Sequence, residues 1–533
     1  MEQKNIEDIN RETQNKIFNP NNSLIPIEGE TPEETAKRFA SNYKFSNNKA
    51  IRGIEKFFQF DTLGAIMKKE VIGGLATFLS LVYILSVQPG LVSGTESITE
   101  GAPNMNYFGI FFATAIASGV GCIFMGLFAN VPVAVSTTMG INTLVAFSVG
   151  NAGGLGYEGA LIVTMISSIL FVTLSLTPLR TKILRVIPKE IILAIGIGIG
   201  VFISYIGLQS MGWFSTTPAG PALGNLSQNW LAIILGMATL AIILILSFRN
   251  IPGAVAIGIV AMFIIALIIA NLLPEDSHWL GYEVTTNVNG TNITTYKNGF
   301  LHDANFKLNG GWTYDFGGLI SNWDNTFSAF TNMDIWNNPI FYVSVFIILL
   351  MNFFDATGTL ATFTHQLNKN TNQHHEISSK ALIVDASGTM VASLMGTTPL
   401  GTFVESSVGI QQGARTGFAA IINGLLFFLA IALFPIFKAI PQCITGAACV
   451  YIGIMLFKEA ELVNWTKMEF VVPTFLTVVF MISSYEIANG IAIGFISYAF
   501  MMLIMKKGKE VSWIMYLLAI LFIAYFIAFA FVQ

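Results

Sequence analysis

Thirteen apolar stretches follow one another along this chain, and that pattern suits a lipid bilayer rather than water. They cover residues 72–91, 106–128, 158–178, 190–208, 230–248, 252–273, 338–360, 380–396, 414–434, 443–457, 470–483, 486–505 and 512–531. An apolar helix of about 20 residues spans the hydrocarbon core, so the shorter stretches must be tilted or packed inside a bundle. Only 11% of the residues are charged, compared with about a quarter in soluble domains. The sequence therefore predicts an all-α polytopic membrane protein.

Two further stretches differ from ordinary spans because they are dense in glycine, serine, threonine and proline. Residues 132–147 read PVAVSTTMGINTLVAF, and residues 397–410 read TTPLGTFVESSVGI. Irregular backbone at membrane depth is tolerated where it lines a cavity, so we expect both to be short broken segments. With these two included, about seven crossings precede residues 274–337 and about seven follow them.

An odd number of crossings orients the two halves oppositely, which is the inverted-repeat arrangement of secondary transporters. Two pairs of similar sequences support this 7+7 repeat. Residues 125–140 (MGLFANVPVAVSTTMG) correspond to residues 393–406 (SLMGTTPLGTFVES). Residues 186–200 (VIPKEIILAIGIGIG) correspond to residues 439–453 (AIPQCITGAACVYIG).

The expected organisation has five parts. They are a cytosolic N-terminal tail (1–55), a first inverted repeat (56–273), an extracellular loop (274–337), a second inverted repeat (338–510) and an extra apolar helix (511–533). Lysine and arginine gather in joints that can all face the cytoplasm together. This pattern predicts a protein of the plasma membrane whose N-terminus lies on the cytoplasmic side. The tail lacks the basic-then-apolar pattern of a cleaved signal peptide, and we expect it to be loosely ordered.

Two carboxylates interrupt the apolar pattern: Asp355 in IFYVSVFIILLMNFFDATGTL, and Glu405 in the second broken segment. An ionised side chain at bilayer depth costs at least about 2.5–3.5 kcal/mol, so a chain retains one chiefly where a cavity, partner or ligand receives it. Burial favours the protonated form of a carboxyl group, so either acid could carry a proton from one side to the other. We therefore predict that Asp355 and Glu405 bind substrate and couple its transport to protons.

Other candidate substrate-binding residues lie on the broken segments or follow Asp355. They are Gly140, Asn142, Phe403, Val404 and Thr359. Interrupted helices leave free backbone N–H groups at their ends. An acid beside such groups can accept ligand N–H bonds while the backbone donates to a ligand carbonyl, which matches the edge of a nucleobase. The sequence thus predicts a pocket for a flat heterocycle, on which the Phe403 ring could stack.

No motif indicates an enzyme, a metal or a cofactor. The five histidines lie in joints, and the sequence contains no zinc-ligand spacing, Walker loop, nucleophile elbow or dinucleotide motif. A net charge of −4 without a basic stripe argues against a nucleic acid partner. The expected partners are a small substrate, a coupling ion and the lipid bilayer.

Several motifs, in the same order, resemble those of the AzgA-like purine permeases within the nucleobase and ascorbate transporter group. They include EVIGGLATFLSLVYILSVQPGLV, FFDATGTL, GTTPLGTFVESSVGI and SYEIANGIAIGFISY, and the resemblance runs from about residue 55 to the end. It implies fourteen segments in two inverted halves, divided into a substrate-binding core domain and a gate domain. It also implies proton-coupled uptake of adenine, guanine, hypoxanthine or a close relative, often by a homodimer.

The resemblance assigns roles to individual residues. Asp355 matches the family's acid on the eighth segment and Glu405 its acid on the tenth, both of which contact substrate, while Asn142 matches an asparagine on the third. Thr359 stands where the related uracil permeases commonly have histidine. The chain departs from the family at Asn352, where many members carry an acid, and at PLGTFVE, which replaces a threonine-rich run. These departures leave open which substrate the chain selects and which ion couples its transport.

Other readings remain open for this sequence. The chain could carry a nucleoside, a pyrimidine base or another small solute, and sodium could replace the proton. An anion carrier of the sulfate type shares the inverted repeat, but paired acids would repel an anion. A channel or a membrane-embedded enzyme is the remaining class; the pair of broken segments argues against an open pore, and the missing catalytic motifs argue against the enzyme.

Overall fold

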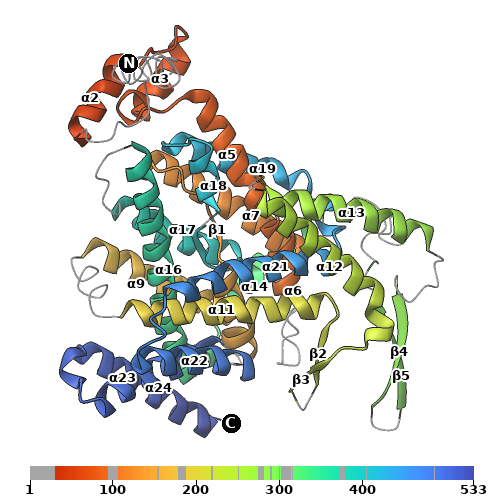
Figure 1. Cartoon of the computed structure of the whole chain (residues 1–533). Helices are drawn as coiled ribbons and strands as arrows, with labels where there is room; N and C mark the ends of the chain where they lie inside the picture. The colour runs from red at the N-terminus through yellow and green to blue at the C-terminus, as the bar shows by residue number, and fades with distance from the viewer. Residues whose placement is uncertain are drawn as a thin grey trace, which may run out of the picture.

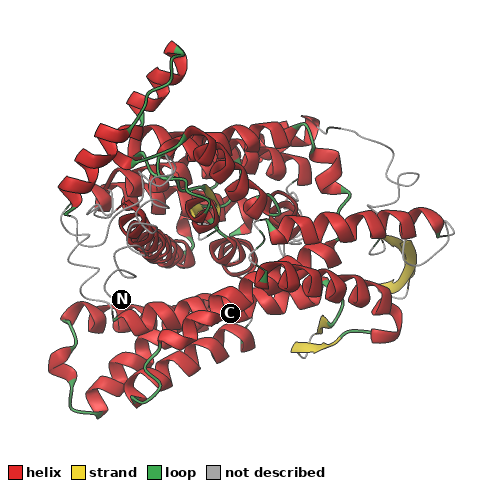
Figure 2. Cartoon of the chain, turned by 45° about the horizontal axis from the view of Figure 1, so that its top comes forward, coloured by secondary structure: helices red, strands yellow, loops and turns green. Residues whose placement is uncertain are grey.

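Helices dominate the molecule, and its strands are few and short (Figure 2). The computed structural model describes residues 31–93, 106–152, 155–177, 188–217, 220–249, 251, 253–273, 281–288, 291–298, 301, 314, 316–371, 379–403, 405–484 and 487–532. Within these residues, seven helices are long and apolar enough to cross a membrane, and four shorter apolar helices accompany them. The prediction of an all-α polytopic membrane fold is therefore confirmed.

The described residues of the first half form seven membrane segments, and the third of them is the first broken segment. They are α5 (Met67–Leu81) with α6 (Ile84–Ser93); α7 (Tyr107–Phe124) with the π-helical η1 (Met125–Ala129); β1 (Val135–Thr137) with α8 (Met139–Thr143) and the π-helical η2 (Leu144–Ala152); α9 (Gly156–Leu176); α11 (Lys189–Ser210); α12 (Leu226–Phe248); and α13 (Ala254–Leu272).

The second half repeats this order of elements. It comprises α16 (Pro339–Thr371); α17 (Ser379–Met395); β6 (Leu400–Thr402) with α18 (Ser406–Gln411); α19 (Gly417–Ile431) with α20 (Phe434–Lys438); α21 (Gln442–Phe457) with η4 (Lys458–Leu462); α22 (Met468–Ser483); and α23 (Ile487–Ile504) with η5 (Gly508–Glu510). The extra apolar helix predicted at 511–533 is α24 (Trp513–Val532), which packs against α23.

The two broken segments meet as an antiparallel strand pair, β1 with β6, in which Ser136 lies opposite Gly401. Two backbone hydrogen bonds flank the pair symmetrically. Thr138 N–H donates to Pro399 O at 3.2 Å, and Phe403 N–H donates to Ala134 O at 3.1 Å. A rotation that exchanges Ser136 with Gly401 also exchanges these two bonds, so a local two-fold axis passes through the crossing. The inverted repeat predicted from the sequence is present in the fold.

The second pair of similar sequences forms a close helix crossing. Pro188 and Pro441 precede the first turns of α11 and α21. Further along, a Cβ on Gly207 would lie 2.5 Å from the Gly446 carbonyl oxygen, and a Cβ on Gly446 would lie 2.7 Å from the Gly207 carbonyl oxygen. Small residues let membrane helices approach in this way. The glycine pair therefore sets the distance between the two helices.

The helices pack in two groups, which correspond to the expected core and gate domains (Figure 1). One group includes α5, α7, α9, α17 and α19, in which α7 packs on α19 and α9 packs on α17. The other includes α11, α12, α13, α21, α22 and α23. Contacts between the groups include α6 against α21, α5 against α13 and α8 against α11. The broken segments and the first segment thus face the second group.

Part of the N-terminal tail is more regular than the sequence analysis predicted. From residue 31 on, where the described part of the chain begins, three helices precede the first membrane segment: α2 (Pro32–Asn42), α3 (Lys49–Phe57) and α4 (Phe60–Leu63). Thr31 and Glu34 form a reciprocal capping box at the start of α2, and Asn48 caps α3. Such caps satisfy the free N–H groups of a helix start, so the expectation of a loosely ordered tail is wrong for this part.

Four further elements lie in the described part of the loop predicted at 274–337. Its strands β4 (Gly281–Val288) and β5 (Thr291–Asn298) form a hairpin, and two helices, α14 (Phe316–Ala329) and α15 (Met333–Asn337), follow. The indole N–H of Trp323 on α14 donates to Met395 O at 3.1 Å, which anchors α14 to the end of α17. Another hairpin, β2 (Phe214–Thr217) with β3 (Gly220–Leu223), follows α11. The sequence analysis predicted neither hairpin.

Candidate functional site

Neighbouring helices hold the strand crossing through small polar side chains. From α7, the hydroxyl of Ser118 lies 2.8 Å from that of Ser136, and Cys122 Sγ donates to Val135 O at 3.2 Å. From α17, the Thr389 hydroxyl donates to Leu400 O at 2.9 Å. Buried backbone groups need such partners. The crossing is therefore held by the helices on either side of it.

Asp355 lies against this crossing. A Cβ on Gly401 would lie 3.0 Å from Asp355 Oδ2 and would overlap the Thr138 hydroxyl. Asp385 on α17 is buried, and it lies close to Asp355 and to the Thr402 backbone. The crossing thus has carboxyl groups from two helices, α16 and α17, beside it.

Glu405 lies at the start of α18, where the second broken segment becomes helical again. Its Oε1 accepts a hydrogen bond from the hydroxyl of Tyr83 at 3.3 Å. Tyr83 is buried and stands between α5 and α6, where the first membrane segment is interrupted. The sequence analysis predicted an unbroken helix there. Tyr83 also lies near Cys449 and Tyr451 on α21, where the two helix groups meet.

Asn142 on α8 is fully buried, and both atoms of its amide have protein partners. Its Oδ1 accepts from the hydroxyl of Thr398 at 2.5 Å, and its Nδ2 donates to Gln88 Oε1. Gln88 Nε2 in turn donates to Thr398 Oγ1 at 2.5 Å. Asn142 was predicted to bind substrate, but its observed hydrogen bonds are to Gln88 of α6 and to Thr398 beside β6.

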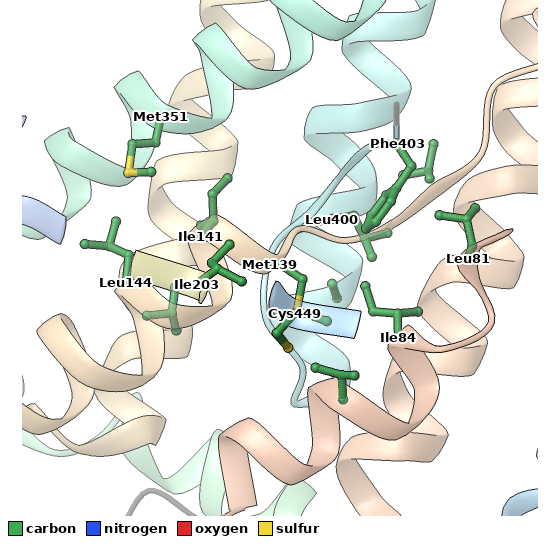
Figure 3. Packing of buried hydrophobic residues seen from close by; sticks show 14 of the residues in the cluster. Leu81, Ile84, Met139, Ile141, Leu144, Ile203, Met351, Leu400, Phe403 and Cys449 are labelled. Carbon is green, nitrogen blue, oxygen red and sulfur yellow. The ribbon is translucent and has the colours of Figure 1, made fainter. Parts of the chain in front are cut away.

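The walls around the crossing are apolar. Figure 3 shows the buried side chains there, which belong to one hydrophobic cluster. Phe403 and Leu400 come from the second broken segment, Met139 from the first, Ile84 from α6 and Cys449 from α21. A few polar groups within apolar walls are typical of small-molecule sites. The arrangement suits a flat, largely apolar ligand with polar edges.

The structure gathers most of the predicted site residues around the crossing. Asp355 adjoins Gly401, Phe403 follows β6, Glu405 begins α18, and Gly140 lies in α8. Thr359, one turn after Asp355, donates its hydroxyl to Asp355 O at 2.7 Å, so this side chain binds its own helix. Val404 lies outside the described residues.

Three functional candidates were missed from the sequence. Gln88 and Tyr83 stand in the first segment, and Thr398 precedes Pro399. A glutamine followed by proline within an apolar run was a usable signal, because both residues are costly in an unbroken membrane helix. Tyr83 gave no such signal, since the residues beside it are apolar.

A comparison with protein-family models decides the family. Residues 68–493 match the model Xan_ur_permease, described as a permease family, and this range covers most of the chain. The chain belongs to the Xan_ur_permease family. It is therefore a transporter rather than an enzyme, and an integral, multi-pass membrane protein, as the sequence predicted. The matched range begins in α5 and ends within α23.

Curated relatives of the Xan_ur_permease family align over nearly their whole length. The guanine/hypoxanthine permease PbuG of Bacillus subtilis is 35% identical over 89% of this chain and 99% of its own. PbuO of the same organism, also named a guanine/hypoxanthine permease, is 32% identical over 86% and 96%. The adenine permease AdeP of Escherichia coli is 30% identical over 88% and 95%.

Solved structures of distant proteins share the fold of this permease. The transmembrane domain of the cyanobacterial bicarbonate transporter BicA superimposes with a TM-score of 0.53 at 13% identity, covering 80% of this chain and 97% of that one. SLC26A9 gives a TM-score of 0.52 at 11% identity, covering 90% and 72%. At such low identity the likeness concerns the fold alone, and it agrees with the 7+7 inverted repeat.

Proposed function

We propose that this protein imports purine nucleobases, namely guanine, hypoxanthine or adenine, by proton symport with alternating access. The proposal includes a plasma membrane location with a cytoplasmic N-terminus, and a homodimer that crosslinking in native membranes can test. The observation that carries it is the pair of acids at the β1–β6 crossing: Asp355 against Gly401, and Glu405 at the start of α18. The names of the curated relatives support a purine as the substrate.

The chemistry of the pocket supports a base with polar edges. Carboxylates accept ligand N–H groups, which purines present, and Phe403 offers an aromatic face. Asn352, one turn before Asp355, is buried, and neither atom of its amide has a hydrogen-bond partner among the described residues. A buried amide without a partner is costly. A ligand that donates and accepts hydrogen bonds would remove that cost.

Coupling to protons follows from the environment of the two acids. A carboxyl group in an apolar chamber is easily neutralised by a proton, whose uptake and release can alternate with exposure to the two sides. Alternating access requires the two helix groups to move relative to each other around the site. The contacts of α6 with α21 and of α8 with α11 lie where such motion would occur.

Uptake of radiolabelled guanine, hypoxanthine, adenine, uracil and a nucleoside into membrane vesicles tests the proposal. We expect accumulation of the purine bases, and we expect a proton ionophore to abolish it. Accumulation that survives the ionophore and follows sodium would overturn the coupling. Uptake of uracil or the nucleoside, with no uptake of any purine base, would overturn the proposed substrate class.

The variant Glu405→Gln tests the role of that acid. The amide keeps the size of the side chain but cannot exchange a proton, so we expect transport to be lost while the protein still accumulates in the membrane. Glu461→Gln, at an exposed position of η4, is the matched control and should transport normally. Full activity of Glu405→Gln would remove this acid from the mechanism.

A further inference from the structure

Gln88, Asn142 and Thr398 close a ring of three hydrogen bonds. Gln88 donates to Thr398, Thr398 donates to Asn142, and Asn142 donates to Gln88. All three side chains have no exposed surface. Each one donates once and accepts once, and the ring closes equally well in the opposite sense. Every polar side-chain atom of the three residues therefore has at least one partner within the ring.

The ring joins three discontinuous segments at one end of the strand crossing. Gln88 comes from α6, Asn142 from α8, and Thr398 immediately precedes Pro399, whose carbonyl accepts from Thr138 N–H. At the symmetry-related end, the described residues show a simpler join, in which Ala134 N–H donates to the Ser406 hydroxyl at 2.9 Å. The ring is thus an asymmetric addition that attaches the first membrane segment to the crossing.

The first membrane segment holds the second broken segment at both of its ends. Gln88 binds Thr398 before β6, and Tyr83, five residues earlier, binds Glu405 after β6. The stretch between these two contacts contains Phe403 and Gly401, which face the proposed site. Its backbone can shift only if one of the two contacts opens. The geometry of the substrate pocket therefore depends on the α5–α6 segment.

We propose that Gln88 and Thr398 are positioning residues of the purine site, and that Asn142 acts through the ring instead of by direct contact with substrate. This inference rests on the proposed function. The ring fixes the distance between α8 and the start of β6, and with it the placement of Phe403 and Glu405. Because α6 also packs on α21, the ring connects the site to the other helix group. The site must move relative to that group during alternating access.

The test compares Thr398→Val with Thr397→Val in purine uptake. Both threonines are fully buried and adjacent, but Thr397 bonds to the hydroxyl of Thr114, at 2.7 Å, outside the ring. Thr398→Val leaves two buried amides incompletely paired, so we expect KM for the purine to rise about tenfold or more, with a smaller change in maximal rate. Thr397→Val should keep the KM of the natural protein, and Thr398→Ser, which retains the hydroxyl, should restore it.

A double-mutant cycle separates the ring from general stability. Opening the ring once removes its function, so Gln88→Met combined with Thr398→Val should raise KM little beyond the larger single effect. Gln88→Met combined with Thr397→Val should give the product of the single effects. If Thr398→Val does not accumulate in the membrane, the KM of Gln88→Met gives the same test, because methionine keeps the length of the glutamine side chain. Thermal unfolding of purified Gln88→Met verifies that this variant is folded.

The outcomes distinguish this inference from the proposed function. If the unmodified protein transports no purine, the proposed function fails. If it transports purines but Thr398→Val and Thr397→Val have equal KM, or the effects of Gln88→Met and Thr398→Val multiply, the ring has no positioning role. A KM raised only in the ring variants and restored by Thr398→Ser supports the inference.

Discussion

Gly401 lies against the carboxylate of Asp355, so closely that a Cβ on residue 401 would be 3.0 Å from Oδ2. A separation of that size is tighter than ordinary van der Waals contact, and the same Cβ would overlap the Thr138 hydroxyl. The missing side chain therefore allows an acid on α16 to approach the strand pair. Polar chemistry at the crossing depends on this glycine as much as on the acid.

Gly401→Ala should consequently impair transport. Overpacking costs about 1–3 kcal/mol, and here the added Cβ would overlap the Thr138 hydroxyl and crowd Asp355. Both side chains must therefore move, and we expect purine uptake to fall at least about tenfold. Gly90→Ala is a suitable control in the membrane, because a Cβ there meets no atom within 4 Å. Uptake kinetics at equal membrane abundance provide the measurement. Equal rates for the two variants would contradict the proposed placement of Asp355.

The crossing of α11 with α21 gives a prediction about stability. A Cβ on Gly446 would lie 2.7 Å from the backbone oxygen of Gly207. Since backbone cannot move aside as a flexible side chain can, Gly446→Ala should lower the free energy of unfolding by about 1–3 kcal/mol. Gly53→Ala, in α3, adds a Cβ that meets no atom within 4 Å, so it should not lower the free energy of unfolding. Thermal unfolding in detergent compares the two, and an unchanged Gly446→Ala would disprove the close crossing.

Arg415 anchors the N-terminal helices to the membrane domain. Its Nη1 donates to Gly64 O at 2.8 Å and to Leu63 O at 3.2 Å, and its guanidinium lies 5.7 Å from the Phe39 ring centre. Hydrogen bonds from a charged group contribute about 1.5–3 kcal/mol, so Arg415→Met should release α2–α4 and speed tryptic cleavage within α3. Lys458→Met, at an exposed position of η4, should cleave like the natural protein. If trypsin cleaved Arg415→Met at the same rate as the natural protein, other contacts would be holding these helices.

The ion pair between Lys507 and Glu469 gives a pH prediction. Its atoms lie 2.6 Å apart, and the carboxylate raises the pKa of Lys507 above its ordinary value. A raised lysine pKa stabilises the fold at and below the ordinary lysine value, and this contribution disappears as pH rises through the raised pKa. Lys507→Met should therefore lower the unfolding temperature at neutral pH, and the difference should shrink in strong alkali. Restored stability in the exchange variant Lys507→Glu with Glu469→Lys would support the pairing. A difference in unfolding temperature between Lys507→Met and the natural protein that did not change with pH would contradict it.

Much of the fold could be predicted because the cost of a polar group in lipid acts locally along the sequence. The apolar stretches correspond to helices, and the dense glycine, serine and threonine at 132–147 and 397–410 correspond to the two broken segments. The break between α5 and α6 could not be predicted in the same way. Leu81, Val82 and Ile84 are apolar, so nothing near Tyr83 distinguishes this turn from continuous helix. The hairpins escaped prediction because they lie outside the apolar pattern.

The sequence by itself determined the membrane class, the approximate number of crossings, the two broken segments at 132–147 and 397–410, and the two acids near them, since hydropathy and backbone propensity are properties of short segments. Only the tertiary structure decided which segments meet. Tyr83 and Glu405 are separated by 322 residues, and Gln88 and Thr398 by 310. Contacts of that range depend on how whole helices pack, which no local pattern encodes. The partners of Asn142 and the approach of Asp355 to Gly401 were decided in the same way.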